Sequence, residues 1–368
     1  MRVVLVVGTS TGGIGQHVRA LAGSLVEAGD DVLVAAPEST LAAFAFEAIG
    51  AAVAEVDVGS TPRPRHDLVA ARRLRELCLG ADVVHAHGLR AGFLAVLALR
   101  GASPRPGLVV TWHNAVLGGG PRRQVLVALE RVVARGAVVT LGASADLVER
   151  ARALGARDAR SGPVAAPTAA PPARGRDEVR AELLAGRDPA TTLLLAAGRL
   201  AEQKDYPTLL AAVGEHWPDD VPAPLLVVAG EGPLREGLER AVRSGALPVL
   251  LLGQRDDVPD LLAAADVYVL SSRWEARALV VQEAARAGVA VVATAVGGVP
   301  ELVEGAAVLV PPGDPAALAG ALAGLVADAG ERARVAAAGL ERSAGWPDQA
   351  ATARQVREVY AEVRGAPG

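Results

Sequence analysis

The sequence predicts an α/β protein of two doubly wound domains, each a parallel sheet covered by helices on both faces. Short, continuous apolar runs alternate with longer helical stretches, as expected for strands that are buried on both faces and joined by helices. A chain of 368 residues is long for one such domain and suits two. The strand-like runs fall into two sets, residues 3–7, 32–35, 83–85, 108–111 and 138–141, and residues 193–196, 225–229, 249–252, 267–270, 289–293 and 308–310.

A segment rich in Pro and Ala, residues 161–175, separates the two sets and has the composition of a linker. Ligands of doubly wound sheets bind at the carboxyl ends of the strands, so we expect a cleft between the two domains. Residues 352–363 have the pattern of an amphipathic helix. The predicted parts are an N-terminal domain over 1–165, a linker over 166–190, a C-terminal domain over 191–348 and a last helical segment over 349–368.

The composition indicates an aliphatic core and a cytoplasmic protein. Hydrophobic residues make up 51% of the chain and aromatic residues only 3%. No apolar run has the length needed to cross a bilayer, and the apolar opening over residues 1–8 is too short for a signal sequence. The single cysteine, Cys78, excludes an internal disulfide.

The net charge of −4 is unevenly distributed. Residues 1–165 carry 18 Lys and Arg against 14 Asp and Glu, a charge of +4, so the remainder carries −8. A mildly basic N-terminal half could attract an anionic acceptor or the inner membrane face as a peripheral contact. Scattered solvated arginines are the alternative.

A glycine-rich stretch follows the first predicted strand. Gly12 and Gly13 stand directly before a helical stretch, where glycine lets the backbone approach a ligand closely. A dinucleotide loop of the short-chain dehydrogenase kind is the competing interpretation, but Ile14 stands where that pattern needs its third glycine. That class also needs a lysine four residues after a tyrosine, which none of the three tyrosines has. The dehydrogenase interpretation therefore fails.

Three histidines lie at the ends of two predicted strands. His85 and His87 end one strand, and His113 follows another. A metal site is the alternative interpretation of these histidines, but no carboxylate or cysteine joins them at ligand spacing. We expect His85 and His87 to pack on the strand with one ring exposed, and we predict no metal site.

Two cations flank the loop after the first strand of the second set. Arg199 follows Gly198 directly, and Lys204 is the only lysine among 37 basic residues. Because Lys and Arg are not interchangeable at phosphates, a lone lysine at this place indicates a specific task. We interpret the pair as a clamp for a diphosphate, with two solvated cations as the alternative.

Glu275 and Glu283 stand on either side of a predicted helix N-terminus. Residues 266–270 predict a strand, and residues 276–288 predict the helix that follows it. Backbone N–H groups at a helix N-terminus favour an anion. Eight residues at the helical rise separate the carboxylates by about 12 Å, which suits a nucleotide-sugar, with its central diphosphate and a hydroxyl-bearing ring at each end. The alternative is an N-cap charge and a solvated helix face.

At these residues the chain resembles the retaining glycosyltransferases of family 4, which have the GT-B fold of two Rossmann-like domains facing each other across a cleft. The Glu-x7-Glu spacing and the turn from Gly297 to Glu301 carry the resemblance. The Gly12-Gly13 loop, the Asp-Val-Val-His-x-His segment over 82–87 and the Thr-x-His segment over 111–113 extend it over nearly the whole chain.

The chain departs from the family's pattern beside Glu275. The family usually has Gly after the first glutamate and an apolar or small residue next, where this chain has Ala276 and Arg277. These departures concern the identity of the donor sugar.

The resemblance implies a role for each matching residue. Glu275 would contact the donor sugar, Glu283 the ribose, and His113 would lie beside the reacting sugar. The implied catalytic residues are His113, Glu275, Arg199 and Lys204; the implied donor-binding residues are Gly12, Gly13, Gly198, Arg199, Lys204, Gly230, Arg255, Ala278, Leu279 and Glu283; the implied acceptor-side residues are His17 and His87.

The resemblance further implies a retaining, metal-independent hexosyltransferase without a cofactor. It would move a sugar from a UDP- or GDP-linked donor to a hydroxyl of a glycan, lipid or small molecule in cell-envelope glycan synthesis, with no nucleic-acid partner. The domain over 1–165 would bind the acceptor, the domain over 191–348 would bind the nucleotide-sugar, and the C-terminal helix over 349–368 would cross back to the N-terminal domain. Two alternatives remain: a GT-B nucleotide-sugar epimerase or hydrolase, and an inactive nucleotide-sugar-binding protein.

Overall fold

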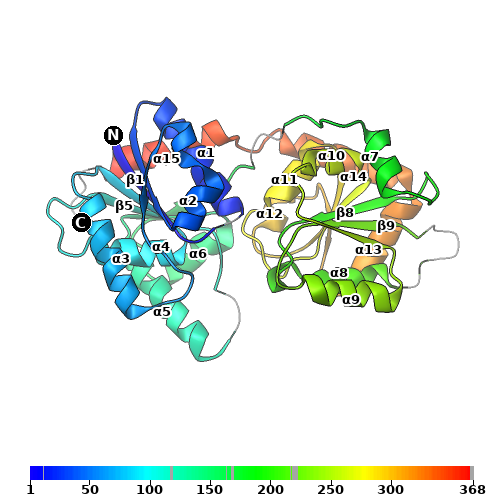
Figure 1. Ribbon diagram of the computed structural model, residues 1–368, viewed down its shortest axis with the longest axis horizontal. Helices are drawn as coiled ribbons and strands as arrows, with labels where there is room; N and C mark the ends of the chain where they lie inside the picture. The colour runs from blue at the N-terminus through cyan, green and yellow to red at the C-terminus, as the bar shows by residue number, and fades with distance from the viewer. Residues whose placement is uncertain are drawn as a thin grey trace. The chain divides into compact units, whose positions relative to one another are not determined.

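The computed structural model describes residues 1–10, 12–116, 119–162, 164–166, 170–215, 217 and 223–364, apart from the side chain of Arg122. The chain divides into two compact units, each a parallel sheet with helices on both faces (Figure 1). Unit 1 comprises Met1–Pro167 and Pro347–Gly368, and unit 2 comprises Thr168–Trp346. The predicted fold class, two Rossmann-like α/β units, is confirmed.

Unit 1 has a seven-stranded parallel sheet in the order β3-β2-β1-β4-β5-β6-β7. Its helices α3, α4 and α5 pack beside one another along the sheet, and the last helix of the chain, α15, packs against α1 (Figure 1). The described elements are β1 (Arg2–Val7), α1 (Gly13–Glu27), β2 (Asp31–Ala36), α2 (Glu38–Phe44), the 3-10 turn η1 (Phe46–Ile49), β3 (Ala52–Glu55), α3 (Pro64–Leu77), β4 (Val83–His87), α4 (Leu89–Ala98), β5 (Gly107–Trp112), α5 (Gly120–Gly136), β6 (Val139–Gly142), α6 (Ala145–Ala153), β7 (Ala159–Ser161) and α15 (Gln349–Val363).

Unit 2 has a six-stranded parallel sheet in the order β10-β9-β8-β11-β12-β13. Its described elements are α7 (Arg176–Leu183), β8 (Leu193–Ala197), the 3-10 turn η2 (Glu202–Lys204), α8 (Tyr206–Val213), β9 (Leu225–Ala229), α9 (Arg235–Gly245), β10 (Val249–Gly253), α10 (Val258–Ala264), β11 (Val267–Leu270), α11 (Leu279–Arg286), β12 (Ala290–Thr294), α12 (Val299–Val303), β13 (Val308–Val310), α13 (Pro315–Ala327) and α14 (Ala329–Ser343).

The central strands are buried on both faces, which explains their continuous apolar runs. Every residue from Val3 to Val7 in β1 has an exposed fraction of 0%, and the residues of β8 and β9 are all buried. Side chains alternate between the two faces of a strand, so a strand covered on both sides is apolar at every position.

The strand order places the ligand-binding edge of each sheet. In unit 1 the order reverses at β1, which lies between β2 and β4, and in unit 2 it reverses at β8, which lies between β9 and β11. Doubly wound sheets bind ligands outside the carboxyl ends of the strands at such a reversal. A ligand is therefore expected at the loops after β1 and β4 in unit 1, and at those after β8 and β11 in unit 2.

Two strands of unit 1 were not predicted. The edge strands β3 and β7 are short and only partly buried, so they lack the apolar run that marks the other strands.

The segment predicted as a linker, 166–190, contains the helix α7, which packs on α10 of unit 2. Its residues 167–169, and residues 365–368 of the predicted C-terminal segment, lie outside the described residues. Among the described helices, none combines the length and the hydropathy that a bilayer crossing requires.

Candidate functional site

In unit 2 the predicted lysine and the first predicted glutamate form an ion pair. Lys204 Nζ lies 2.7 Å from Glu275 Oε1, and the two side chains are 22% and 11% exposed. The hydroxyl of Ser272 donates a second hydrogen bond to Glu275 Oε1 at 2.8 Å. Lys204 and Glu275 meet because β8 and β11 are neighbours in the sheet, so the loops that follow these strands lie beside each other.

The turn predicted at Gly297 and Gly298 holds the backbone of Glu275. Gly298 donates its N–H to the carbonyl oxygen of Glu275 at 2.9 Å. Gly297 has φ +51°, and a Cβ at this position would lie 2.0 Å from the same oxygen. Only glycine allows this approach, so the turn fixes where the carboxylate of Glu275 stands.

Glycines also bring the loops after β8, β9 and β10 into backbone contact. A Cβ on Gly230 would lie 2.0 Å from the carbonyl oxygen of Gly198, and Gly230 donates its N–H to the carbonyl of Gly253 at 2.7 Å. The ammonium of Lys204 lies over Gly198, 3.7 Å from where a Cβ would stand. At this edge of the sheet, glycine backbone therefore lies beside the ammonium of Lys204.

Helix α11 begins at Leu279, three residues later than predicted. Residue Ala278 before it has an extended conformation, with φ −65° and ψ 100°, and its methyl side chain offers no acceptor for the first N–H groups of the helix. Those N–H groups, together with the helix dipole, favour an anion at this end.

Glu283 lies on α11, one turn into the helix, and is partly buried. Burial raises the pKa of its carboxyl to about 7. Burial is also the main cause of the raised pKa of the Tyr268 hydroxyl, and the charges of Glu275 and Glu283 raise it further.

The remaining predicted cations occupy different surroundings. Arg199 is exposed on the loop after β8. Arg255, after β10, forms a bidentate pair with Asp257, with Nε 2.7 Å from Oδ1. A ligand that bound Arg255 would compete with that carboxylate.

In unit 1 the loop after β1 leads directly into α1. Gly12 precedes the helix, and a Cβ placed there would have no atom within 4 Å, so the space over the start of α1 is open. Gly15 serves packing instead, since a Cβ there would lie 2.1 Å from the ring of Phe44.

Three buried histidines converge at the same edge of unit 1. His17 comes from α1, His87 ends β4, and His113 follows β5; their exposed fractions are 7%, 3% and 7%. Their ring centroids lie 5.4–5.6 Å apart, and His87 Nδ1 is 3.1 Å from His113 Nε2. We call these three residues the histidine cluster.

A fourth histidine, His85, is buried behind the cluster. Its Nδ1 lies 2.6 Å from the hydroxyl of Tyr360 on α15, and its Nε2 lies 2.7 Å from the hydroxyl of Thr111. Burial lowers the pKa of His17 to about 4 and that of His85 to about 3, and it lowers the pKa of His87 and His113 well below the ordinary value. All four rings are therefore neutral at neutral pH.

Two family descriptions match most of the chain. "Glycosyl transferase 4-like domain" matches residues 12–164, and "Glycosyl transferases group 1" matches residues 191–328. The chain belongs to this family. As a family 4-like, group 1 glycosyltransferase it has the GT-B arrangement of two parallel Rossmann-like sheets.

Curated relatives are similar over part of their length. A D-inositol 3-phosphate glycosyltransferase of Salinispora tropica is 33% identical over 317 residues, which cover 76% of this chain and 64% of that protein. A protein of the same name from Xylanimonas cellulosilytica is 38% identical over 179 residues, 46% of this chain and 42% of its own. The chain thus spans less than two thirds of the length of these relatives.

Solved structures share the fold over the whole chain. Anabaena HepE in complex with UDP-glucose has a TM-score of 0.80 at 20% identity, and covers 98% of this chain and 99% of its own. A sucrose-phosphate synthase of Thermosynechococcus elongatus has a TM-score of 0.78 at 20% identity. The match covers 99% of this chain and 100% of that one. At these identities the likeness shows the fold alone.

The structure brings the predicted site residues of this chain together within each unit. In unit 2, Gly198, Lys204, Gly230, Glu275 and the start of α11 border the ends of β8, β9 and β11. In unit 1, the Gly12 loop and the histidine cluster border the ends of β1, β4 and β5.

One expectation about the histidines is wrong. His85 and His87 were expected to leave one ring exposed, but their exposed fractions are 0% and 3%. The covering side chains include Tyr360 of α15 and His17 of α1. Both come from segments far from these residues in sequence, so local pattern could not show the burial.

Sequence reasoning did not link His17 to the other two histidines, and it missed Ser272 as a partner of Glu275. A signal for the first was available. His17 lies about one turn into α1, the helix that follows β1, and doubly wound sheets place their first strand at the reversal of strand order, here between β2 and β4.

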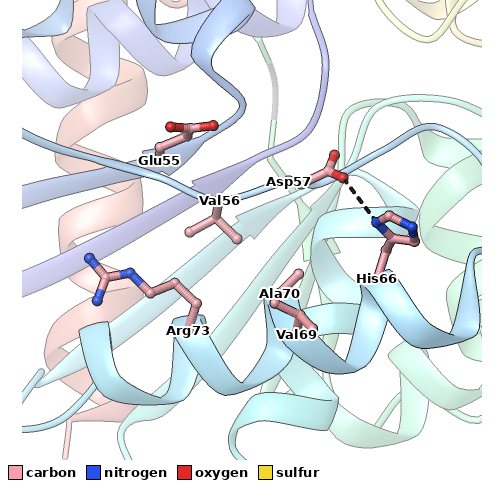
Figure 2. Close-up of a pocket in the computed structure, with 7 residues that line it drawn as sticks. All are labelled: Glu55, Val56, Asp57, His66, Val69, Ala70 and Arg73. Carbon is pink, nitrogen blue, oxygen red and sulfur yellow. Dashed lines mark ion pairs between the residues drawn. The ribbon is translucent and has the colours of Figure 1, made fainter.

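An open hollow of about 220 Å³ lies between the end of β3 and α3. Figure 2 shows the side chains that line it. The hollow contains the pair His66 and Asp57, whose Nδ1 and Oδ2 atoms are 4.0 Å apart and whose side chains are largely exposed. The residues that line it are Glu55, Val56, Asp57, His66, Val69, Ala70 and Arg73. No predicted site residue is among them, and we assign the hollow no role in catalysis.

Proposed function

We propose that this protein transfers a sugar, with retention of anomeric configuration and without a metal, from a nucleoside diphosphate donor to a hydroxyl acceptor. The donor is a UDP- or GDP-sugar, and no cofactor takes part. Lys204, Arg199 and the first N–H groups of α11, at Ala278 and Leu279, stabilise the departing diphosphate. Glu275 positions the donor sugar and Glu283 binds the ribose.

The observation that carries this proposal is the pair of Lys204 and Glu275 at the edge of the sheet. A buried carboxylate that accepts from Ser272 suits the hydroxyls of a sugar, while a compact ammonium beside bare glycine backbone suits phosphate oxygens. Both stand at the point where the strand order reverses, which is the usual place for such a ligand. Preorganised charges of this kind stabilise charge that develops on a leaving group.

The comparisons support the class of donor. HepE was solved with UDP-glucose, and two similar curated proteins are D-inositol 3-phosphate glycosyltransferases. In unit 1, His113 lies beside the reacting sugar and His17 and His87 face the acceptor in this proposal. The acceptor is a glycan, a lipid or a small molecule, in keeping with cell-envelope synthesis at the cytoplasmic membrane face.

The test begins with a thermal-shift panel of UDP-, GDP- and ADP-linked sugars, because a ligand stabilises the folded state in proportion to its binding. The donor that raises Tm is then incubated with hydroxyl acceptors, and the anomeric configuration of the product is read by NMR. Turnover of donor without an acceptor would identify an epimerase or hydrolase. Binding without turnover in any acceptor panel would identify a nucleotide-sugar-binding protein.

Donor affinity is expected to rise with pH between 6 and 8. The pKa of Glu283 is raised to about 7, so its ionised fraction grows across this range. An ionised carboxylate accepts hydrogen bonds from ribose hydroxyls more strongly than a protonated carboxyl does. We expect donor affinity to rise by at most roughly tenfold, because the ionised fraction of Glu283 grows from about one tenth at pH 6 to about nine tenths at pH 8. Calorimetry with the donor nucleotide-sugar measures this gain directly, because the diphosphate of the donor does not change its protonation between pH 6 and 8.

The matched control is Glu283→Gln, which keeps the shape of the side chain and cannot ionise. This variant should bind donor with no pH dependence between 6 and 8, while Glu283→Ala should weaken binding by about 1–3 kcal/mol at pH 8. Unchanged affinity in both variants would remove Glu283 from the donor site.

The basic N-terminal half predicts a salt effect on the acceptor side. If the acceptor is anionic or lies on an anionic surface, its KM should rise steeply with ionic strength while the KM of the donor changes less. The measurement is steady-state kinetics at several salt concentrations with each substrate varied in turn. Equal responses for both substrates would mean that these arginines form an ordinary solvated surface.

A further inference from the structure

The histidine cluster has the composition and the spacing of a metal site. One ligand atom each from His17, His87 and His113 can be chosen so that all three lie within 4.8 Å of one another. The three residues come from α1, β4 and the loop after β5, so a shared ion would connect three elements at the carboxyl edge of the sheet.

Hydrogen bonding within the cluster leaves a nitrogen unused. His87 uses Nδ1 toward His113, but its Nε2 is buried and has no hydrogen-bond partner among the described residues. A buried nitrogen without a partner destabilises the folded state. His85 differs, because Tyr360 and Thr111 occupy both of its nitrogens. The cluster thus has three imidazoles that can ligate, and His85 supports the strand behind them.

We propose that the histidine cluster binds a Zn²⁺-class divalent cation through three imidazoles, with the fourth position open to water. Imidazole nitrogens suit Zn²⁺ and related d-block ions, whereas Mg²⁺ and Ca²⁺ require oxygen ligands. Zinc–nitrogen bonds of about 2.0–2.1 Å place the ligands of a tetrahedral site about 3.3 Å apart. His87 Nδ1 and His113 Nε2 lie 3.1 Å apart, close to this spacing, so an ion held by these two atoms would replace the hydrogen bond between them.

This site shares His17, His87 and His113 with the acceptor side of the proposed transfer reaction, but it does not use the residues assigned to the donor diphosphate. The residues assigned to the donor diphosphate, Arg199 and Lys204, belong to unit 2, and the histidine cluster belongs to unit 1. An enzyme that transfers sugar in the presence of EDTA and a protein that binds Zn²⁺ at the cluster are therefore compatible results. Binding of the metal alone is the readout.

The experiment uses the full chain, stripped with EDTA and dialysed, and titrated with Co²⁺ as a spectroscopic substitute for Zn²⁺. We expect one equivalent to produce the intense visible absorption of a four-coordinate ion, and one equivalent of Zn²⁺ to abolish it. Each of His17→Gln, His87→Gln and His113→Gln should weaken Zn²⁺ binding by about 100-fold or more. His66→Gln, an exposed histidine of the same unit, should bind as the wild type does.

The faint absorption of a six-coordinate ion, or variants that bind as the wild type does, would overturn the proposal. Since a variant of a buried residue can fail to fold, X-ray absorption of the zinc-loaded wild type provides an independent measurement. Three imidazole nitrogens around zinc would support the site. A shell of oxygens alone, or one that includes the sulfur of Cys78, would refute it.

Discussion

Lys204→Ala is expected to lower kcat/KM for sugar transfer by about 30-fold to 1,000-fold, in the presence and in the absence of EDTA. The loss corresponds to about 2–4 kcal/mol, the range for one lost preorganised group that meets developing charge. Removal of the ammonium also takes the partner charge from the largely buried carboxylate of Glu275, which keeps its hydrogen bond from Ser272. The loss of kcat/KM for Arg199→Ala should be at the low end of this range. Arg199 is exposed, so water can solvate the diphosphate in place of the missing guanidinium.

The measurement is the initial rate of each variant with and without EDTA. Arg187→Ala provides the control, since Arg187 is an exposed basic residue of the same unit, away from the strand ends. Its rate should match the wild type. A metal-free mechanism is contradicted if EDTA abolishes activity and added Mg²⁺ or Mn²⁺ restores it, because a divalent ion would then replace the fixed cations at the diphosphate.

Gly230→Ala is expected to lower the free energy of unfolding of unit 2 by about 2–6 kcal/mol. The backbone of Gly230 has φ +149°, and a Cβ there would lie 2.0 Å from the carbonyl oxygen of Gly198. That carbonyl also accepts the hydroxyl of Tyr206 at 3.0 Å, so it has little freedom to withdraw. The expected loss combines about 1–3 kcal/mol of overpacking with about 1–3 kcal/mol of backbone strain.

Urea unfolding followed by tryptophan fluorescence measures this loss, because Trp217, Trp274 and Trp346 all belong to unit 2. Gly237→Ala is the matched control. It lies in the exposed part of α9, has no atom within 4 Å of a Cβ, and should stabilise the unit by about 0.5–1 kcal/mol as alanine replaces glycine in a helix. Equal midpoints for the two variants would show that the backbone contact at Gly230 does not constrain the loops.

The sequence alone was sufficient for the class of fold and for the residue types of the site. Strands such as β1 and β9 are buried on both faces, so each is apolar at every interior position and can be recognised without its neighbours. Glycines such as Gly297 could be predicted because the conformation that they adopt is accessible to few other residues. The lone Lys204 was conspicuous by composition alone.

Contacts between segments that are distant in the chain were decided only by the tertiary structure. Lys204 and Glu275 touch because β8 and β11 are neighbours, and His17 joins His87 and His113 because β1, β4 and β5 are adjacent. Strand order depends on how helices pack across a whole sheet, and this packing leaves no local pattern in the sequence. Burial of a polar side chain such as His85 is decided in the same way, because its covering residue, Tyr360, stands 275 residues away.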